Sequence, residues 1–574
     1  MYSELKNVQV IISLLKQYDI CNMVLSPGTR NVPLVHSVEQ DPFFKCYSMV
    51  DERSAAYFAL GLAEISDQPI CLSCTSSTAT CNYFPAVVEA RARGLKLIIL
   101  TADRDNYLLK QGEDQLIPQD NMFGDFTIAD VNLPIVQTER ELKYCIRKCN
   151  EALIASTNRE NPGPCQINFQ INRIDLCRSS SLPTYRKVDV IYSDENEKMR
   201  SKKHELANYK KIMIILGQSY YEERDKIEYF LDVFFHKYNC MITYEETSNL
   251  HSQYFLKTCL IAESMTEREF SDYCPDLVIT FGGHSFSFLK YKLRNNYKRI
   301  THWRVSNNRD YLDNYDALRS MFIMSEIEFL SFMNNFNGSN NFEYYNKWKI
   351  RLKEVKFPAL GFSNYFVVKK FCEFVPDNSL VHLSILNSVR LFNFNSKGNT
   401  ISFSNLGADG IDGCMPTFLG QADAYDGLAF LVIGDLSYFY GLNSSIIPHN
   451  KNIRILVINN HAGGEFHNNF GEEKIPTLRD YISAGHKSNV ADSVDMTDFI
   501  YLSADNEDAL DRALKMFCNI SKQPIILEVF TDAEYESNVI KKFYDINQKL
   551  TLRETILKKG KIIARKGLHM LRKK

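Results

Sequence analysis

Two polar residue pairs between residues 431 and 460 have the types and the spacing to hold a metal ion. Gly434-Asp435 ends one apolar strand, Asn459-Asn460 ends the next, and Asp435 lies 25 residues before Asn460. In a right-handed βαβ unit both pairs emerge at the carboxyl ends of parallel strands, where α/β sheets bind ligands. A carboxylate, an amide oxygen and a nearby backbone carbonyl suit a hard cation such as Mg2+, which keeps its other positions for phosphate oxygens and water. A helix-capping Asp and a turn at a strand end would explain the same residues without a metal.

The elements that must position these pairs alternate between short apolar strands and helix-length segments. This pattern predicts α/β domains with parallel sheets and crossover helices. A polar segment without apolar rhythm is predicted to be a linker, and a basic, partly amphipathic segment ends the chain. The predicted parts are residues 1–182, the linker 183–208, residues 209–340, residues 356–540 and the tail 541–574.

Composition indicates an ordinary soluble globular protein. Of the 574 residues, 45% are hydrophobic and 24% are charged, and the net charge is −2. Residues 541–574 carry +10, so the rest of the chain carries −12, which argues against nucleic acid as the main partner. The tail is interpreted either as a contact for an acidic partner or an anionic surface, or as a solvated helix or disordered end.

The chain is expected in the cytoplasm. Its fifteen cysteines lack the paired spacing of a zinc site, and buried thiols in a reducing compartment are a simpler explanation. Residues 1–20 have charges between apolar positions at helical spacing, which predicts an amphipathic helix and not a signal peptide. No apolar stretch approaches the ~20 residues that a membrane-spanning helix needs.

Seven further segments, in order along the chain, carry a resemblance to one enzyme family. They are SPGTRNVPL (26–34), MVDERSAAYFALGLAE (49–64), CTSSTATCNYFPAVVEA (74–90), LTADR (100–104), GEDQLIPQ (112–119), SNLGADGIDG (404–413) and NNHAGGEF (459–466). Together with the GD and NN pairs, they resemble the thiamine-diphosphate-dependent 2-succinyl-5-enolpyruvyl-6-hydroxy-3-cyclohexene-1-carboxylate synthases.

The resemblance implies a fold and an assembly. The fold is three doubly wound parallel-sheet domains of the thiamine-diphosphate enzyme type: a pyrimidine-binding domain (1–182), a central domain (209–340) and a diphosphate-binding domain (356–540). The implied cofactors are thiamine diphosphate and Mg2+ or Mn2+. A homodimer or homotetramer is implied as well, because the family combines the first domain of one subunit with the third domain of another in each active site.

The resemblance also implies a cofactor site. Glu52 matches the glutamate that hydrogen-bonds N1' of the cofactor's aminopyrimidine, although acidic residues at a helix start are favourable in any protein. Ile411 matches the aliphatic residue that separates the two cofactor rings. Asp435, Asn460 and the backbone carbonyl of Ala462, where the family usually has glycine, match the metal ligands. Further cofactor contacts are implied for Ser26, Pro27, Gly28, Thr78, Asn82, Gly434, Leu436, Ser437 and Gly463.

The implied reaction is decarboxylation of a 2-oxo acid and transfer of the resulting acyl-anion equivalent to an acceptor, which forms a carbon–carbon bond. The acceptor and the donor are small molecules. The residues that match substrate-binding positions are Thr29, Arg30, Arg104, Gln115, Ser384 and Arg390.

Several substrate positions depart from the family pattern. Leu406 stands where the family has arginine, and Phe288 and Leu289 stand where it has a basic pair. Ser384 and Arg390 are six residues apart, not four, and Glu465 replaces an aliphatic residue near the cofactor. Because arginines would hold the carboxylates of 2-oxoglutarate and isochorismate, these changes favour a different 2-oxo acid or acceptor.

Three alternatives remain open. The chain is an authentic synthase in which cations such as Arg390 and Lys290 replace the missing arginines, or a simple 2-oxo acid decarboxylase, or a non-catalytic protein that binds the cofactor. Glu465, like His461, is predicted either to act as a general acid or base or to make an ordinary loop contact.

Overall fold

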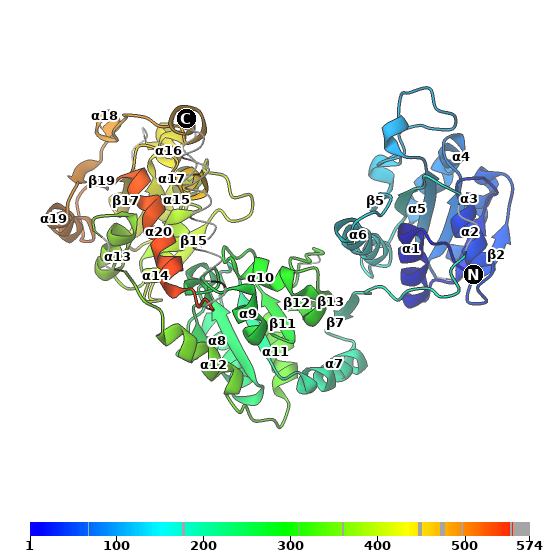
Figure 1. The fold of residues 1–574 in the computed structure, drawn as a ribbon, viewed down its shortest axis with the longest axis horizontal. Helices are drawn as coiled ribbons and strands as arrows, with labels where there is room; N and C mark the ends of the chain where they lie inside the picture. Colours follow the sequence, from blue (N-terminus) through cyan, green and yellow to red (C-terminus); the bar gives the residue numbers. More distant parts are fainter. Residues whose placement is uncertain are drawn as a thin grey trace. The chain divides into compact units, whose positions relative to one another are not determined.

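A computed structural model describes residues 1–66, 68–174, 178–308, 310–358, 361–445, 450–470, 477–494, 497–551 and 554. Within these residues the chain forms three parallel β-sheets, one after another in chain order, with helices between the strands (Figure 1). This confirms the predicted fold class. No described helix has the length and apolar character that a membrane crossing requires.

The chain divides into two compact units. The first comprises residues 1–190 and 310–321, and the second comprises residues 191–309 and 322–574. The first sheet lies in the first unit and the third sheet in the second. The boundary between the units passes through strands β7 and β13 of the central sheet.

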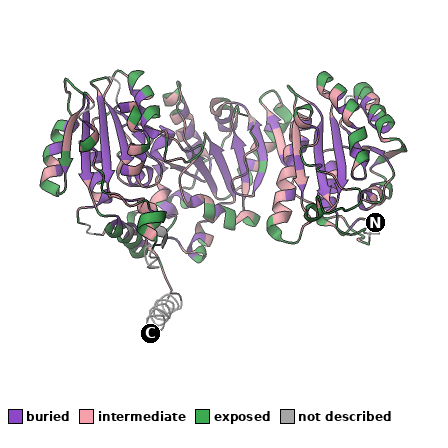
Figure 2. Ribbon diagram, turned by 90° about the horizontal axis from the view of Figure 1, so that it is seen from above, coloured by how far each residue is buried: buried purple, intermediate pink, exposed green. Residues whose placement is uncertain are grey.

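The first sheet has the strand order β2-β1-β3-β4-β6-β5. Alternate residues of β4 point to two separate cores: Ile98 and Leu100 pack with α1, α2 and α6, whereas Leu97 and Ile99 pack with α3, α4 and α5. Helices therefore cover both faces, and the central strands are buried along their whole length (Figure 2). The strands are β1 (Asn22–Leu25), β2 (Lys45–Ser48), β3 (Ile70–Cys74), β4 (Leu97–Asp103), β5 (Ala129–Leu133) and β6 (Cys165–Gln170). The helices are α1 (Lys6–Gln17), α2 (Val32–Glu39), α3 (Glu52–Ser66), α4 (Thr78–Asn82), α5 (Phe84–Arg93) and α6 (Glu139–Ser156).

The central sheet has the strand order β10-β9-β8-β11-β12-β13-β7. Its strands are β7 (Asp189–Tyr192), β8 (Ile212–Leu216), β9 (Cys240–Tyr244), β10 (Phe255–Leu256), β11 (Leu277–Phe281), β12 (Thr301–Val305) and β13 (Leu318–Ile323). Its helices are α7 (Asn196–Asn208), α8 (Arg224–Lys237), α9 (Glu267–Tyr273), α10 (Leu289–Asn295), α11 (Glu326–Asn334) and α12 (Glu343–Lys353).

Residues 183–208, predicted to be a linker, contain β7 and α7. The side chains that α7 buries are Met199 and Leu206, and both belong to one face of the helix because they are two turns apart. Two apolar residues in thirteen are too few to produce a visible helical period, which is why the sequence pattern did not reveal the helix.

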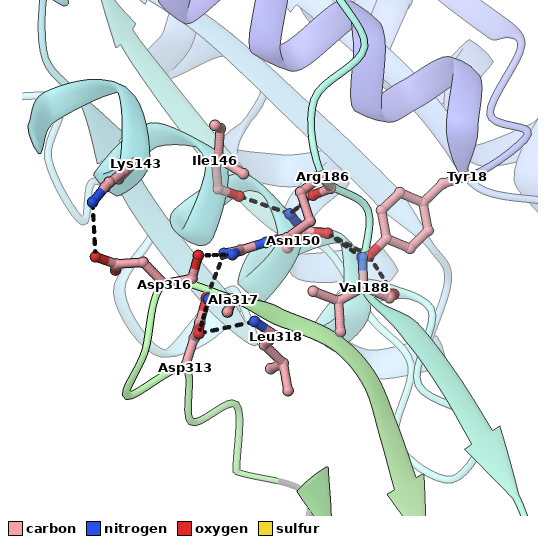
Figure 3. Close-up of polar contacts among 10 residues, drawn as sticks. All are labelled: Tyr18, Lys143, Ile146, Asn150, Arg186, Val188, Asp313, Asp316, Ala317 and Leu318. Atoms are coloured by element: carbon pink, nitrogen blue, oxygen red, sulfur yellow. Dashed lines mark hydrogen bonds and ion pairs between the residues drawn. The ribbon is translucent and has the colours of Figure 1, made fainter. Parts of the chain in front are cut away.

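Residues 310–321 follow the central strands in sequence but belong to the first unit. Figure 3 shows the polar contacts that hold them there. Arg186 pairs with the carboxylate of Asp313 and donates to the backbone carbonyl of Asp316. The amine of Lys143, on α6, lies 3.3 Å from the carboxylate of Asp316. Polar contacts within the first unit therefore hold this segment in place.

The third sheet has the strand order β15-β14-β16-β17-β19-β18. Side chains of α13, α14, α19 and α20 pack in one core and those of α15 and α16 in another, so this sheet is also covered on both faces. The strands are β14 (Leu380–Leu383), β15 (Ile401–Ser404), β16 (Ala429–Gly434), β17 (Ile453–Asn459), β18 (Ile500–Ala504) and β19 (Ile525–Phe530). The helices are α13 (Asn364–Phe374), α14 (Asn387–Asn395), α15 (Cys414–Asp423), α16 (Asp435–Tyr440), α17 (Gly464–Phe470), α18 (Ala491–Val494), α19 (Glu507–Phe517) and α20 (Ala533–Asn547).

The predicted basic tail begins within α20. Residues 552–553 and 555–574 lie outside the described residues. Both interpretations of the tail therefore remain predictions.

Candidate active site

The two polar pairs of the third sheet meet at one edge. β16 and β17 are parallel neighbours with Gly434 opposite Ile458, so Asp435 and Asn460 follow their strands at the same end. The Asp435 carboxylate accepts the backbone N–H of Asn460 at 3.1 Å, and the Asn460 side-chain oxygen accepts the N–H of Ala462 at 3.1 Å. The structure brings the three predicted metal-binding residues together, and their role as ligands remains a prediction.

The chemistry of this group fits a hard divalent cation. The Asp435 side chain is 5% exposed, and Nε2 of His486 lies 3.2 Å from its carboxylate. Burial raises the pKa of Asp435, whereas the N–H of Leu436 and the nearby His486 lower it. No cluster of three or more His, Cys, Asp or Glu side chains that could hold a metal occurs in the described part of the chain. A metal here would use amide and carbonyl oxygens beside one carboxylate, a set that Mg2+ and Mn2+ accept.

These residues line a cavity of about 140 Å³. The loop before α15 is held beside the cavity because the Ser437 hydroxyl donates to the backbone carbonyl of Ile411. The hydroxyl oxygens of Ser384 and Ser437 lie 3.1 Å apart, which holds the end of β14 at the same place. The predicted site residues that line the cavity are Ser384, Ile411, Gly434, Asp435, Leu436, Ser437, Asn460, Ala462, Gly463 and Glu465.

Arg390, a predicted substrate-binding residue, is paired within the chain. Its two terminal nitrogens lie 3.1 and 3.3 Å from the Glu465 carboxylate oxygens, and one of them donates to the Asn387 side chain at 2.6 Å. Glu465 lines the cavity, whereas the paired Arg390 is not one of its lining residues. Leu406, at the position where arginine was expected, is buried and apolar. The guanidinium of Arg390 therefore already has an acidic partner, Glu465.

Glu52 lies at the first position of α3, next to a carboxylate with a different task. Asp51 accepts the backbone N–H of Ser54 at 2.9 Å and its hydroxyl hydrogen, so Asp51 caps the helix. Within the described residues, no hydrogen bond or ion pair of the Glu52 side chain is present. Helix capping therefore accounts for Asp51 but not for Glu52. The Glu52 carboxylate remains available to contact a ligand.

The surroundings of Glu52 are buried and polar. Burial raises the pKa of the Tyr83 hydroxyl, the charges of Cys74 and Glu52 raise it further, and Ser26 lowers it. The hydroxyl oxygen of Ser26 is also buried, and no protein group of ordinary hydrogen-bond geometry reaches it in the described structure. Such unpaired polar groups beside a carboxylate suit a heterocyclic ring with donor and acceptor atoms.

The loops that precede α2 and α4 pack closely together. A Cβ atom on Gly28 would lie 2.3 Å from Cβ of Thr75, so only glycine fits between these loops. Ser77 adopts a positive φ of 73° where the chain turns into α4. Thr78 and Asn82 are exposed on α4, and Pro27 is exposed beside Gly28. The predicted cofactor residues of the first unit therefore lie on two tightly packed turns.

The predicted substrate residues of the first unit include two neighbouring cations. Burial lowers the pKa of Arg30, the charge of Arg104 lowers it further, and Glu113 opposes both effects. Arg104 pairs with Glu113. The backbone carbonyl of Gln115 accepts the Ser76 hydroxyl at 2.8 Å, which ties its loop to the start of α4, and Thr29 is exposed. This group could bind an anionic ligand.

Sequence reasoning did not select His486, Asn387 or Phe286. His486 is 51 residues from Asp435 and lies in a loop, so no local pattern connects them. Asn387 was visible three residues before Arg390, in the segment whose spacing was disturbed. The ring centroid of Phe286 lies 5.5 Å from the Arg390 guanidinium, a contact between the central and third sheets that no periodicity encodes.

Comparisons with known proteins show which proteins this chain is similar to. Residues 5–122 match the family model described as "Thiamine pyrophosphate enzyme, N-terminal TPP binding domain". Nearly the whole chain is similar to proteins named 2-succinyl-5-enolpyruvyl-6-hydroxy-3-cyclohexene-1-carboxylate synthase. That of Bacteroides thetaiotaomicron is 32% identical over 562 residues, which are 95% of this chain and 99% of the relative. Those of Phocaeicola vulgatus and Flavobacterium johnsoniae are 32% and 31% identical, again over 95% of this chain and 99% of each relative.

Proposed function

The chain belongs to the 2-succinyl-5-enolpyruvyl-6-hydroxy-3-cyclohexene-1-carboxylate synthase family, and on that premise we propose which reaction it catalyses and which residues act in it. It is a thiamine-diphosphate-dependent enzyme that decarboxylates a 2-oxo acid and transfers the acyl group to an acceptor. The observation that carries the proposal for the site is the cavity at the ends of β16 and β17, where Asp435, Asn460 and Ile411 meet.

In this proposal the cofactor is held from two sides. Asp435, Asn460 and the carbonyl of Ala462 would hold Mg2+ or Mn2+ and, through it, the diphosphate. Ile411 would separate the two rings, and Ser26 and Glu52 of the first unit would contact the pyrimidine. Glu52 would hold a proton shared with a ring nitrogen, because a carboxylate without a protein partner is available for it.

Thiamine diphosphate, when bound, supplies the electron sink for decarboxylation. The bond between the carboxylate carbon and the keto carbon of the donor breaks, and carbon dioxide leaves. The electron pair remains with the former keto carbon, which then forms a carbon–carbon bond to an electron-poor acceptor carbon, while the acceptor takes up one proton. Arg30 and Arg104 would hold an anionic group of the acceptor, and Ser384 would contact the donor.

The authentic synthase reaction, with 2-oxoglutarate and isochorismate, is the second candidate. Its support is the similarity to the named synthases over 95% of the chain. The paired state of Arg390 and the apolar Leu406 argue for a changed donor or acceptor instead.

We propose that two or four copies assemble, with each active site shared between two of them. Exposed apolar side chains near Glu52 support this, because Val50, Tyr57 and Phe58 are left in contact with water in a single copy. The fourteen described cysteines are all free thiols, which supports a reducing compartment such as the cytoplasm.

The experiment gives the purified protein thiamine diphosphate, Mg2+ and a panel of 2-oxo acids, with and without isochorismate, and follows carbon dioxide and products. We expect carbon dioxide release that a chelator abolishes and that Mg2+ or Mn2+ restores, because the diphosphate is held through the cation. Isochorismate-dependent turnover of 2-oxoglutarate would identify the authentic synthase. A protein that binds the cofactor and decarboxylates no donor would contradict the proposal.

A further inference from the structure

Glu465 of α17, which lines the cavity, forms an ion pair with the buried Arg390 of α14. We propose that this pair makes the enzyme select a 2-oxo acid with an uncharged side chain as its donor. The inference rests on the proposed function and names the class of substrate that the site accepts.

The ion pair is bidentate, and its guanidinium is almost fully buried. The Arg390 side chain is 5% exposed and the Glu465 side chain 23%. Two nitrogen–oxygen contacts of 3.1 and 3.3 Å join them, and Asn387 accepts a further N–H of Arg390 at 2.6 Å. Nε of Arg390 is buried and has no hydrogen-bond partner among the described residues. A bidentate pair of this kind satisfies the terminal nitrogens that would otherwise bind a carboxylate of a ligand.

Two aromatic rings cover the guanidinium as well. The ring centroids of Phe286 and Phe288 lie 5.5 and 5.3 Å from the central carbon of Arg390. At these distances the rings attract the cation, and they also occupy space from which a ligand could approach it.

The segment that carries these rings is fixed by a buried carboxylate. Glu245 accepts the hydroxyl of Ser285 at 2.7 Å and the backbone N–H groups of Phe286 and Ser287 at 2.9 and 2.6 Å. The next residue, Glu246, donates its N–H to Asn393 of α14 at 2.8 Å. The helix that carries Arg390 and the loop that covers it are therefore tied to each other.

A second acid lies near the same cation. Burial raises the pKa of Glu263, and the charge of Arg390 lowers it, while Glu465 raises it again. Tyr544 also lowers the pKa of Glu263. Burial lowers the pKa of Arg390, whereas the charges of Glu465, Tyr544 and Glu263 raise it. A donor carboxylate beside Glu465 would be a third acidic group around one cation.

Beside the polar Asn387 and Ser388, part of the cavity lining is apolar. Ile385, Leu386 and Leu391 line the same cavity as Glu465. A carboxylate placed there would lose its hydration without gaining a free cation, which is costly, whereas a methyl or methylene group would lose nothing. The site therefore favours aliphatic 2-oxo acids over dicarboxylic ones. In both classes of donor, the bond that breaks is the one between the carboxylate carbon and the keto carbon.

The test compares two donors that differ in one group. 2-Oxopentanoate and 2-oxoglutarate both have five carbons, and the first ends in a methyl group where the second ends in a carboxylate. In the presence of thiamine diphosphate and Mg2+, two equivalents of ferricyanide oxidise each donor to carbon dioxide and a shortened acid, whose new oxygen atom comes from water, so no acceptor substrate is needed. We expect kcat/KM for 2-oxopentanoate to exceed that for 2-oxoglutarate by at least about tenfold, the effect of an unfavourable charge in a binding site.

The variant Glu465→Gln removes the carboxylate that pairs with both terminal nitrogens of Arg390 and leaves Glu263 as the nearby acid. We expect it to raise kcat/KM for 2-oxoglutarate relative to 2-oxopentanoate by about tenfold or more, mainly through KM, because the cation can then pair with the donor. A merely structural role of Glu465 would lower both values together. The matched control is Glu373→Gln on α13, whose side chain is 44% exposed and pairs with Lys370, and it should leave the ratio unchanged.

A preference of the unaltered enzyme for 2-oxoglutarate would overturn the inference, and this comparison needs no variant. An unchanged ratio in a folded Glu465→Gln protein would also overturn it. Failure of every donor to release carbon dioxide, with thiamine diphosphate bound, would instead overturn the proposed function on which the inference depends. The outcomes are therefore distinguishable.

Discussion

Adjacent carboxylates at the start of α3 do different work. Asp51 satisfies the free N–H of Ser54 and thereby replaces a hydrogen bond that the first turn of a helix cannot make. Glu52 shares the favourable electrostatics of the helix start but makes no such bond within the described residues. Two like charges in sequence are therefore separable by mutation: Asp51 affects the helix, and Glu52 affects the chemistry in the proposed function.

Replacement of Glu52 by glutamine is expected to lower turnover at least about 100-fold, because the amide cannot exchange the proton that the proposed mechanism assigns to the carboxyl group. Binding of thiamine diphosphate, measured by titration of intrinsic fluorescence, should change only a few-fold. Asp51→Asn is the control, since asparagine caps a helix as well as aspartate and should retain activity. Near-normal turnover of the Glu52→Gln protein would contradict the assigned role.

Glu536 offers a prediction about pH. Its side chain is buried, and it accepts the N–H of Asn364 at 2.6 Å. Burial raises the pKa of Glu536 from an ordinary value of 4.5 to about 8, although the bond from Asn364 opposes the shift. The folded state thus holds the proton more tightly than the unfolded state does. The stability that this proton contributes is complete below pH 4.5 and is lost as the pH rises towards 8.

Glu536→Gln imitates the protonated acid, so the variant should lose less stability than the unaltered protein between pH 5 and pH 8. The linkage relation limits the difference at pH 8 to about 5 kcal/mol. Urea unfolding at both pH values measures it. Glu534→Gln, at an exposed position of the same helix, should show no such change. Equal pH dependence of the Glu536→Gln and unaltered proteins would contradict burial of a neutral carboxyl group.

At the scale of elements, the ends of β8 and β11 approach each other without room for side chains. A Cβ atom on Gly217 would lie 2.2 Å from the backbone oxygen of Gly283. The backbone there is fixed by hydrogen bonds, since Gly217 donates to Phe281 and Gln218 to His284, both at 2.9 Å. Because the obstacle is backbone, it cannot move as a flexible side chain could.

Gly217→Ala is therefore expected to destabilise the second unit by about 1–3 kcal/mol, the usual cost of overpacking. Gly420→Ala is the opposite case: Gly420 is exposed inside α15, and no described atom lies within 4 Å of its added Cβ. Alanine there should stabilise by about 0.5–1 kcal/mol through helix propensity. Thermal unfolding of both variants measures whether stability falls in Gly217→Ala and rises in Gly420→Ala. Unchanged stability of the Gly217→Ala protein would show that the strand ends can separate.

The elements that could be predicted from sequence are those with dense apolar patterns. The buried strands β3, β4, β16 and β17 are continuous apolar runs, and such runs between helical segments imply parallel pairing. α7 was missed because it buries only Met199 and Leu206. The return of residues 310–321 to the first unit depends on single polar contacts such as Arg186 to Asp313, and these leave no period in the sequence.

In the candidate site, too, the features that leave a pattern in the sequence were predictable, and single contacts between distant residues were not. Asp435 and Asn460 were predictable because strand order alone places the ends of β16 and β17 together. The pairing of Arg390 with Glu465 joins residues 75 positions apart on two helices, so it required coordinates. The sequence did show both members as departures from the family pattern, Arg390 by its spacing from Ser384 and Glu465 by its residue type, which is why their contact bears on the substrate.

At the scale of the whole molecule, the halves of the proposed cofactor site belong to different compact units. Glu52 lies in the first unit and Asp435 in the second. The proposed assembly joins the first unit of one copy with the second unit of another, so that neither copy has a complete site of its own. Complementation between two inactive variants distinguishes this arrangement from a site within one chain.

Glu52→Gln and Asp435→Asn proteins, carrying different affinity tags, should each be inactive alone. In a mixed dimer with shared sites, one site receives both substitutions and the other receives none. Co-expression with random pairing should therefore restore about a quarter of the activity of the unaltered enzyme, since half of the dimers are mixed and each has one intact site of two. Purification through both tags in succession should raise this to about half. An inactive doubly tagged fraction that still binds thiamine diphosphate would show that each chain builds its site alone, because then no pairing of these two variants could bring an intact Glu52 to an intact Asp435.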